Sequence, residues 1–230
     1  MKILEIEGNK PLIGTIRIGG AKNSAVALIP AAILTNNKVT LTNIPDITDV
    51  NILCEMLEYL NVDVKRASQS IVLDPANMVN RPIPDELSTQ LRASYYFMAS
   101  LLAKYKKVSM SFPGGCKIGS RPIDQTLKVF KALGANVIEE ECLFTIEAEK
   151  LIGNTIDLDM PSVGATVNAL IVASLAEGTT IINNAAREPE IVNLADMLNK
   201  MGARITGAGT STIKIIGATT TYEYETYILR

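Results

Sequence analysis

The chain of 230 residues contains no histidine. This absence excludes hydrolase mechanisms in which a histidine of the same chain acts as general base for a serine or cysteine nucleophile. The three cysteines, Cys54, Cys116 and Cys142, are an odd number without metal-like spacing, so neither a zinc site nor a disulfide framework is expected. Proton transfer must therefore use Cys, Lys, Asp, Glu or Tyr.

The sequence also lacks a strong charge of either sign, since 22 basic residues face 24 acidic ones. We expect no nucleic-acid partner, and any anion site must be local. No apolar run is long enough to cross a bilayer, and the first residues alternate charged and apolar side chains instead of forming a signal-peptide core. These features predict a cytoplasmic protein without membrane insertion. The hydrophobic content of 47% is ample for a packed core.

One pattern of helix and strand occurs three times, with a period of about seventy residues. Its clearest landmark is a helix end followed by a strand, at Met56–Val64, Phe130–Val137 and Leu198–Ile205. Gly134 and Gly202 stand where a helix end favours a left-handed residue, and Asn61 is the usual second choice. An ordinary α/β domain with accidental similarity is the alternative, but three matching intervals favour a true repeat.

Each landmark is preceded by a strand that starts at Val39, Val108 or Thr180, and a helix begins sixteen residues before each of these. These helices, Ser24–Leu34, Ala93–Ala103 and Ala165–Ala176, are apolar on nearly every face, which predicts burial. We therefore expect an α/β fold of three repeats around three buried helices. Their amino termini would converge, and the partial positive charge of each would favour an anion there.

The segment from Phe112 to Pro122 is glycine-rich and contains Cys116, with Lys117 and Arg121 within five residues of it. Neighbouring cations stabilise a thiolate, so this is a candidate reactive cysteine. The same cations suit an anionic substrate. The alternative is a solvated turn with an idle cysteine, whereas Cys54 and Cys142 are expected to be inert packing residues.

Two further cations lie at the predicted starts of buried helices. Lys22 follows Gly19-Gly20-Ala21, but Asn23 comes next instead of Ser or Thr, so the motif is not a nucleotide P-loop. It is a candidate phosphate contact or a solvated lysine. Arg92 opens the second helix and needs an anionic partner, which is either a ligand or a structural salt bridge.

Four motifs in order carry a resemblance to a known family. They are Gly20-Ala21-Lys22-Asn23, Phe112-Pro113-Gly114-Gly115-Cys116 with Ile118, Gly119, Arg121, Pro122 and Asp124, Ser162-Val163-Gly164-Ala165-Thr166, and Asn184 to Val192. The whole chain resembles the UDP-N-acetylglucosamine 1-carboxyvinyltransferases, the enolpyruvyl transferases of peptidoglycan synthesis. The cysteine loop separates it from the sister enzymes of the shikimate pathway.

The resemblance implies an inside-out α/β barrel domain of three βαβαββ repeats. It implies that residues 1–20 belong to a second domain, that 21–220 form the first domain, and that 221–230 begin the crossing back. The second domain of the family supplies an aspartate base and further arginines, so we expect the full reaction to require it, or a separate second half or self-association to replace it.

The resemblance also implies the chemistry, with phosphoenolpyruvate and UDP-N-acetylglucosamine as substrates and no cofactor or metal. Cys116 would be the general acid that protonates the methylene carbon of phosphoenolpyruvate. Lys22, Asn23 and Arg121 would hold that substrate, and Arg92 would lie at the shared site. The uridine nucleotide would contact Arg121, Pro122, Ile123, Asp124, Gln125, Pro161, Ser162, Val163 and Gly164. Met160 stands where family members can carry a phosphate-binding lysine.

Overall fold

The computed structural model describes most of the chain. The described residues are 3–9, 11, 13–16, 18–111, 123–140, 143–218 and 226–228, with residues 140 and 226–228 described by their backbone alone. Cys116, Arg121, Pro122 and Cys142 lie outside these ranges.

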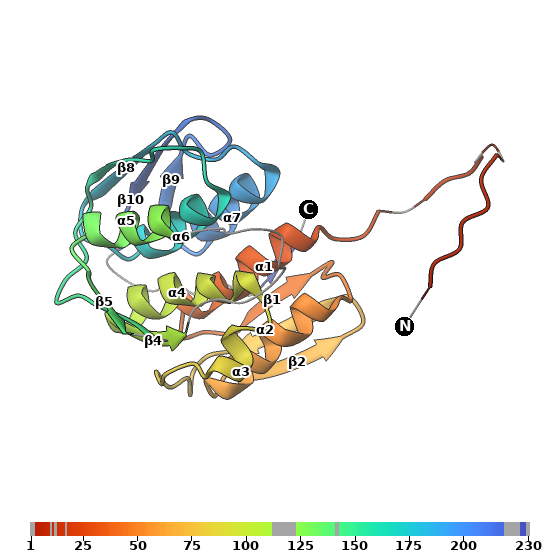
Figure 1. Cartoon of the computed structure of the whole chain (residues 1–230), viewed down its shortest axis with the longest axis horizontal. Coiled ribbons are helices and arrows are strands. Elements are labelled where there is room, and N and C mark those ends of the chain that lie inside the picture. The colour runs from red at the N-terminus through yellow and green to blue at the C-terminus, as the bar shows by residue number, and fades with distance from the viewer. Residues whose placement is uncertain are drawn as a thin grey trace.

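Three units of the same element order follow one another along the chain (Figure 1). The first contains α1 (Lys22–Ala31), η1 (Ala32–Leu34), β1 (Val39–Thr42), α2 (Thr48–Tyr59), β2 (Asp63–Ala67) and β3 (Ser70–Asp74). The second contains α3 (Asp85–Ser88), η2 (Arg92–Tyr95), α4 (Tyr96–Tyr105), β4 (Lys107–Ser111), α5 (Asp124–Ala132), β5 (Asn136–Glu140) and β6 (Leu143–Glu147). The third contains β7 (Thr155–Asp157), α6 (Val163–Ala173), β8 (Thr179–Asn183), α7 (Pro189–Lys200), β9 (Arg204–Thr206) and β10 (Thr212–Ile216), and β11 (Thr226–Ile228) follows it.

The three sheets share one topology. Their strand orders are β11-β1-β3-β2, β4-β6-β5 and β7-β8-β10-β9, and the last three positions of each pair antiparallel. Each set of three antiparallel strands also has a parallel neighbour at one edge. In the third unit this neighbour is β7, which pairs with β8, and in the second unit it is an isolated bridge from Ile83 to Met110 of β4. In the first sheet the parallel neighbour is β11, which pairs with β1 and places Thr226 opposite Thr40. The repeat of three βαβαββ units is therefore confirmed, and the end of the chain completes the first sheet.

The three buried helices form the centre, and the sheets lie outside them (Figure 1). Every residue of α1 from Ser24 onward is buried, and α4 packs against both α1 and α6. Two side chains of α4 bind backbone oxygens of the first unit. Ser100 Oγ donates to Pro30 O in α1 at 2.7 Å, and Lys104 Nζ donates at 2.8 Å each to Ile33 O in η1 and to Thr35 O just after it. Along β3 and β10 every second residue is buried and its neighbours are more accessible, because one sheet face covers the helices.

The amphipathic helices end where the sequence predicts. Asn61, Gly134 and Gly202 have φ angles of 64°, 95° and 102°, so each adopts the left-handed conformation that stops a helix. The buried helices differ slightly from prediction, because the second opens as the 3-10 turn η2 and α6 ends at Ala173 instead of Ala176.

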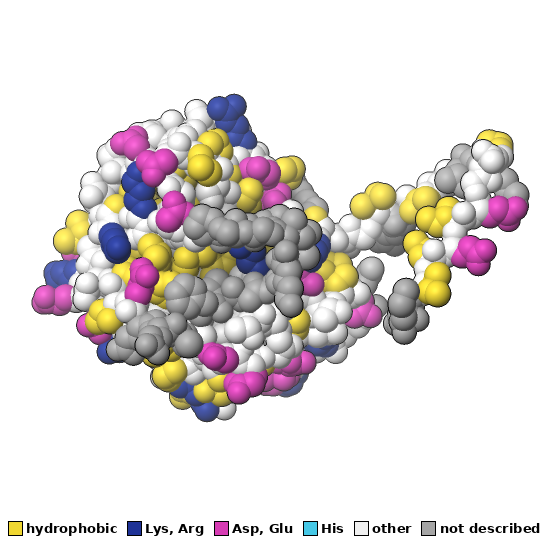
Figure 2. All heavy atoms as spheres, viewed as in Figure 1, with side chains coloured by type: hydrophobic (Ala, Val, Ile, Leu, Met, Phe, Trp, Pro, Cys, Tyr) yellow, Lys and Arg dark blue, Asp and Glu magenta, His cyan; other side chains and the backbone are white. Residues whose placement is uncertain are grey.

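The described part of residues 3–20 forms an extended arm that projects from the body (Figures 1 and 2). Its apolar side chains are exposed, including Ile6 at 79% and Ile13 at 95%. That this arm belongs to a second domain, and that residues 221–230 begin a crossing, remain predictions. No helix within the described ranges combines the length and the apolar character that a membrane crossing needs.

Candidate functional site

The amino-terminal ends of the three buried helices line one open cleft of about 740 Å³. Lys22 and Asn23 come from α1, Arg92 comes from η2, and the third side is formed by Ser162, Val163 and Gly164 at the start of α6. Residues from three units, far apart in sequence, thus share one surface. The predicted convergence of the helix starts is confirmed.

Backbone N–H groups at two of these helix starts have no side-chain cap. Ala21 precedes α1 and Leu91 precedes η2, and neither provides a side-chain hydrogen bond to its helix. At α6, by contrast, Ser162 Oγ accepts from Ala165 N at 3.3 Å, which is an ordinary N-cap. Uncapped helix N–H groups carry partial positive charge, so the α1 and η2 side of the cleft favours an anion.

The two predicted cations of the cleft have different surroundings. Lys22 Nζ lies 2.5 Å from Asp49 Oδ2, so this lysine forms an ion pair and is not simply solvated. The guanidinium of Arg92 lies 5.8 Å from the ring centre of Tyr95, and no carboxylate of the described residues forms an ion pair with it. Of these two cleft cations, Arg92 is therefore the one that has no carboxylate partner among the described residues and is available to an anionic ligand.

Tyr95 and Tyr96 form one wall of the cleft, and the sequence patterns did not single them out. Their rings stack with centroids 4.6 Å apart, and burial raises the pKa of both phenols, so both stay protonated at neutral pH. Tyr95 Oη lies so close to Gly164 that an added Cβ would be 1.6 Å from it. Gly164 is therefore required by contact with Tyr95. The signal available in the sequence was a pair of adjacent tyrosines three and four residues after Arg92.

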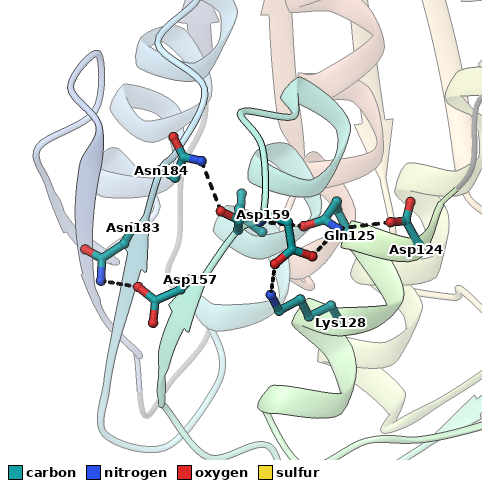
Figure 3. Close-up of polar contacts among 8 residues, drawn as sticks. Asp124, Gln125, Lys128, Asp157, Asp159, Asn183 and Asn184 are labelled. Atoms are coloured by element: carbon teal, nitrogen blue, oxygen red, sulfur yellow. Dashed lines mark hydrogen bonds and ion pairs between the residues drawn. The ribbon is translucent and has the colours of Figure 1, made fainter.

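Gln125 connects α5 to the loop that leads into α6 (Figure 3). Its Oε1 accepts from Asp159 N at 3.0 Å, and its Nε2 donates to carboxylate oxygens of Asp159 at 2.9 Å and Asp124 at 3.0 Å. Lys128 Nζ lies 2.6 Å from Asp159 Oδ1, and hydrogen bonds from Lys128 and then Gln125 lower the pKa of Asp159. These contacts position the Met160–Gly164 turn. Met160 itself is 63% exposed.

Asn23 has a partner in the third unit that the sequence patterns did not indicate. Its Nδ2 donates to Glu190 Oε1 at 3.0 Å, across 167 residues of sequence. Glu190 lies in the first turn of α7, where Pro189 stands at the helix start as expected. An acidic residue is common at a helix start, where it is usually exposed to solvent. Glu190 is only 8% exposed, so interaction with the helix start does not by itself explain its position.

The remaining predicted site residues are placed only in part. Ile123 and Asp124 stand at the start of α5, whereas Cys116, Arg121 and Pro122 lie outside the described residues. Cys54 is buried, as a packing residue should be, and desolvation raises its pKa to about 11, which disfavours the reactive thiolate. No group of three or more Cys, Asp and Glu side chains among the described residues could hold a metal ion.

Comparison with known proteins gives matches along almost the whole chain. The family model of EPSP synthase (3-phosphoshikimate 1-carboxyvinyltransferase) matches residues 6–229. UDP-N-acetylglucosamine 1-carboxyvinyltransferase 2 of Listeria innocua is 50% identical over 214 residues, which are 93% of this chain and 51% of that protein. The protein of the same name from Bacillus subtilis is 48% identical over 217 residues, 94% of this chain and 51% of its own length. The chain thus spans about half the length of these curated relatives.

Solved structures share the fold. The enolpyruvyl transferase NikO from Streptomyces tendae superposes with a TM-score of 0.83 at 22% identity, over 96% of this chain and 53% of its own. EPSP synthase from Acinetobacter baumannii superposes with a TM-score of 0.72 at 17% identity, over 96% of this chain and 51% of its own. With the family model matching nearly every residue, the chain belongs to the EPSP synthase (3-phosphoshikimate 1-carboxyvinyltransferase) family.

Proposed function

We propose that this protein acts in the transfer of enolpyruvyl from phosphoenolpyruvate to the 3-hydroxyl of UDP-N-acetylglucosamine, with release of phosphate. The carrying observation is the cleft in which Lys22, Asn23, Arg92 and the start of α6 meet. Relatives about 50% identical carry the name of this reaction. The cellular role would be the first committed step of peptidoglycan synthesis in the cytoplasm, and with it cell-wall biogenesis, cell shape and cell division.

Both substrates are anions, and the described part of the cleft has groups that suit them. Uncapped N–H groups at α1 and η2 favour phosphate or carboxylate oxygens, and Arg92 can form charge-assisted hydrogen bonds with the same groups. Lys22 would exchange part of its contact with Asp49 for the ligand. The turn at Pro161, Ser162, Val163 and Gly164, held by Gln125 through Asp159, would contact the uridine nucleotide together with residues 121–125.

The proposed reaction proceeds by addition and then elimination. Cys116 would donate a proton to the methylene carbon of phosphoenolpyruvate while the sugar 3-hydroxyl oxygen bonds to the adjacent carbon and loses its proton to a base. In the second step a methyl proton is removed, the double bond re-forms, and phosphate departs. Arg121 would stabilise the phosphate and carboxylate, and Cys116 could also add to the same carbon and form a phospholactoyl adduct. No metal or organic cofactor takes part.

A second candidate function is binding of the nucleotide sugar without turnover, either alone or in assembly with a separate second half. The match to about half the length of the relatives favours it.

Phosphate release from the two substrates distinguishes these functions. The purified chain and its Cys116→Ser variant are incubated with phosphoenolpyruvate and UDP-N-acetylglucosamine, and binding of the nucleotide sugar is measured in parallel. Release by the parent that the variant lacks supports transfer by this chain. Binding without release supports the second candidate, and a chain that neither binds nor releases contradicts both.

A further inference from the structure

Glu190 is a buried acid that does not line the cleft itself but contacts Asn23, which does. It is 8% exposed in the first turn of α7, and α7 packs against α1 (Figure 1). A buried carboxylate needs a polar partner, because leaving one unsatisfied is costly. No Lys or Arg of the described residues forms an ion pair with Glu190, and its hydrogen-bond donor there is Asn23 Nδ2 at 3.0 Å. The contact therefore ties this acid to a residue that lines the cleft.

The chemistry of the pair fixes the orientation of the Asn23 amide. A carboxylate only accepts hydrogen bonds, whereas a primary amide has a donor nitrogen and an acceptor oxygen. If the amide were turned over, Asn23 Oδ1 would face an oxygen of Glu190 and both acceptors would be unsatisfied. In the described part of the chain no donor bonds Oδ1 of Asn23, and this residue lines the cleft. The oxygen is thus left as an acceptor for a ligand.

We propose that Glu190 is a positioning residue that holds the Asn23 amide so that Oδ1 accepts a hydrogen bond from an O–H or N–H group of the bound sugar. This inference rests on the proposed nucleotide-sugar function. It excludes deprotonated phosphate and carboxylate oxygens as partners of Oδ1, because they have no hydrogen to donate. Glu190 would act through Asn23 and not touch the substrate itself.

The contact can be tested without any ligand, from the side-chain amide signals of Asn23 in a nitrogen-15 spectrum of the purified chain. Glu190→Gln replaces the carboxylate by a neutral amide of the same shape, and we expect the Asn23 signals to shift clearly. Glu188→Gln is the matched control, since Glu188 is exposed two residues earlier. Asn23 signals that respond equally to both variants, or to neither, overturn the proposed contact.

An exchanged pair tests the role in binding UDP-N-acetylglucosamine by calorimetry. Asn23→Asp alone places two carboxylates together, and we expect affinity to fall by about tenfold or more. Combining it with Glu190→Gln restores the hydrogen bond in reverse, keeps the total charge, and still offers an acceptor oxygen at position 23. We expect the double variant to return to within about threefold of the parent, a loss of less than about 1 kcal/mol.

Three results have distinct meanings. A double variant that binds no better than Asn23→Asp overturns the proposal that a ligand donor meets Oδ1. A double variant that recovers supports it, because that variant restores both the hydrogen bond to position 190 and an acceptor oxygen at position 23. If the parent chain does not bind the nucleotide sugar, the proposed function fails, and the amide signals still decide whether Glu190 positions Asn23.

Discussion

Replacing Gly164 by alanine tests how closely the second and third units pack at the cleft. Gly164 lies in the first turn of α6, where an ordinary glycine-to-alanine change would raise stability by up to about 1 kcal/mol through helix propensity. At this position the new Cβ would lie 1.6 Å from Tyr95 Oη and 2.8 Å from Tyr95 Cζ. Tyr95 is 6% exposed and stacked on Tyr96, so the ring has little room to move.

We therefore expect Gly164→Ala to lower the stability of the protein instead of raising it. Overpacking against a buried side chain costs about 1–3 kcal/mol, which exceeds the helix-propensity gain, so we expect Gly164→Ala to destabilise by about 1–2 kcal/mol. For a chain of this size that corresponds to a fall in melting temperature of about 2–8 °C. Urea unfolding followed by far-ultraviolet circular dichroism measures the change.

Tyr95→Phe supplies the matched background for this test. It removes the hydroxyl oxygen that the new Cβ meets first and leaves Cζ as the nearest atom at 2.8 Å. We expect the cost of Gly164→Ala to be smaller in this background, because the shortest overlap is gone. Gly164→Ala that stabilises the protein by about 1 kcal/mol in both backgrounds would refute the packing argument.

Three further predictions concern Ser100, Lys104 and the cysteines. Ser100→Ala removes the buried hydrogen bond to Pro30 O and should cost about 1–3 kcal/mol in urea unfolding, whereas a neutral result contradicts its role. Burial lowers the pKa of Lys104 from 10.5 to about 8, so from pH 8 to 10 the unfolded chain keeps a proton that the folded chain has lost. The unfolding free energy of the parent minus that of Lys104→Met should therefore rise with pH over this range. A difference that does not change with pH would contradict the lowered pKa. With its pKa near 11, Cys54 should react with iodoacetamide only on unfolding, and an electrophile such as fosfomycin should label Cys116 first.

Much of the architecture could be predicted from local sequence patterns. The buried helices are apolar on all sides, and residues such as Gly134 and Gly202 end helices through their own backbone preference. Matching intervals then placed Asn23, Arg92 and Gly164 at equivalent helix starts, and the structure brings all three to one cleft. The helices and their ends depend on residues that are close in sequence, so local patterns are sufficient to predict them.

Features that depend on contacts between distant segments could not be predicted in the same way. The pairing of β11 with β1 joins the two ends of the described body, and a three-residue strand carries no signal for its partner. The hydrogen bond between Asn23 and Glu190 spans 167 residues, and a glutamate after a proline looks like ordinary helix-start chemistry. The close approach of the Tyr95 hydroxyl to Gly164 became apparent only from tertiary packing.

Binding of UDP-N-acetylglucosamine to the purified chain, measured by calorimetry, tests the central claim that the cleft at the three helix starts is the substrate site. The decisive comparison is Arg92→Ala with Arg81→Ala, because each arginine lies over a tyrosine ring, at 5.8 Å from Tyr95 and 5.0 Å from Tyr59, but Arg92 alone of the two lines the cleft. We predict that the parent binds, that Arg92→Ala loses about tenfold or more in affinity, and that Arg81→Ala binds like the parent. Absence of binding by the parent, or equal losses in the two variants, would contradict the account.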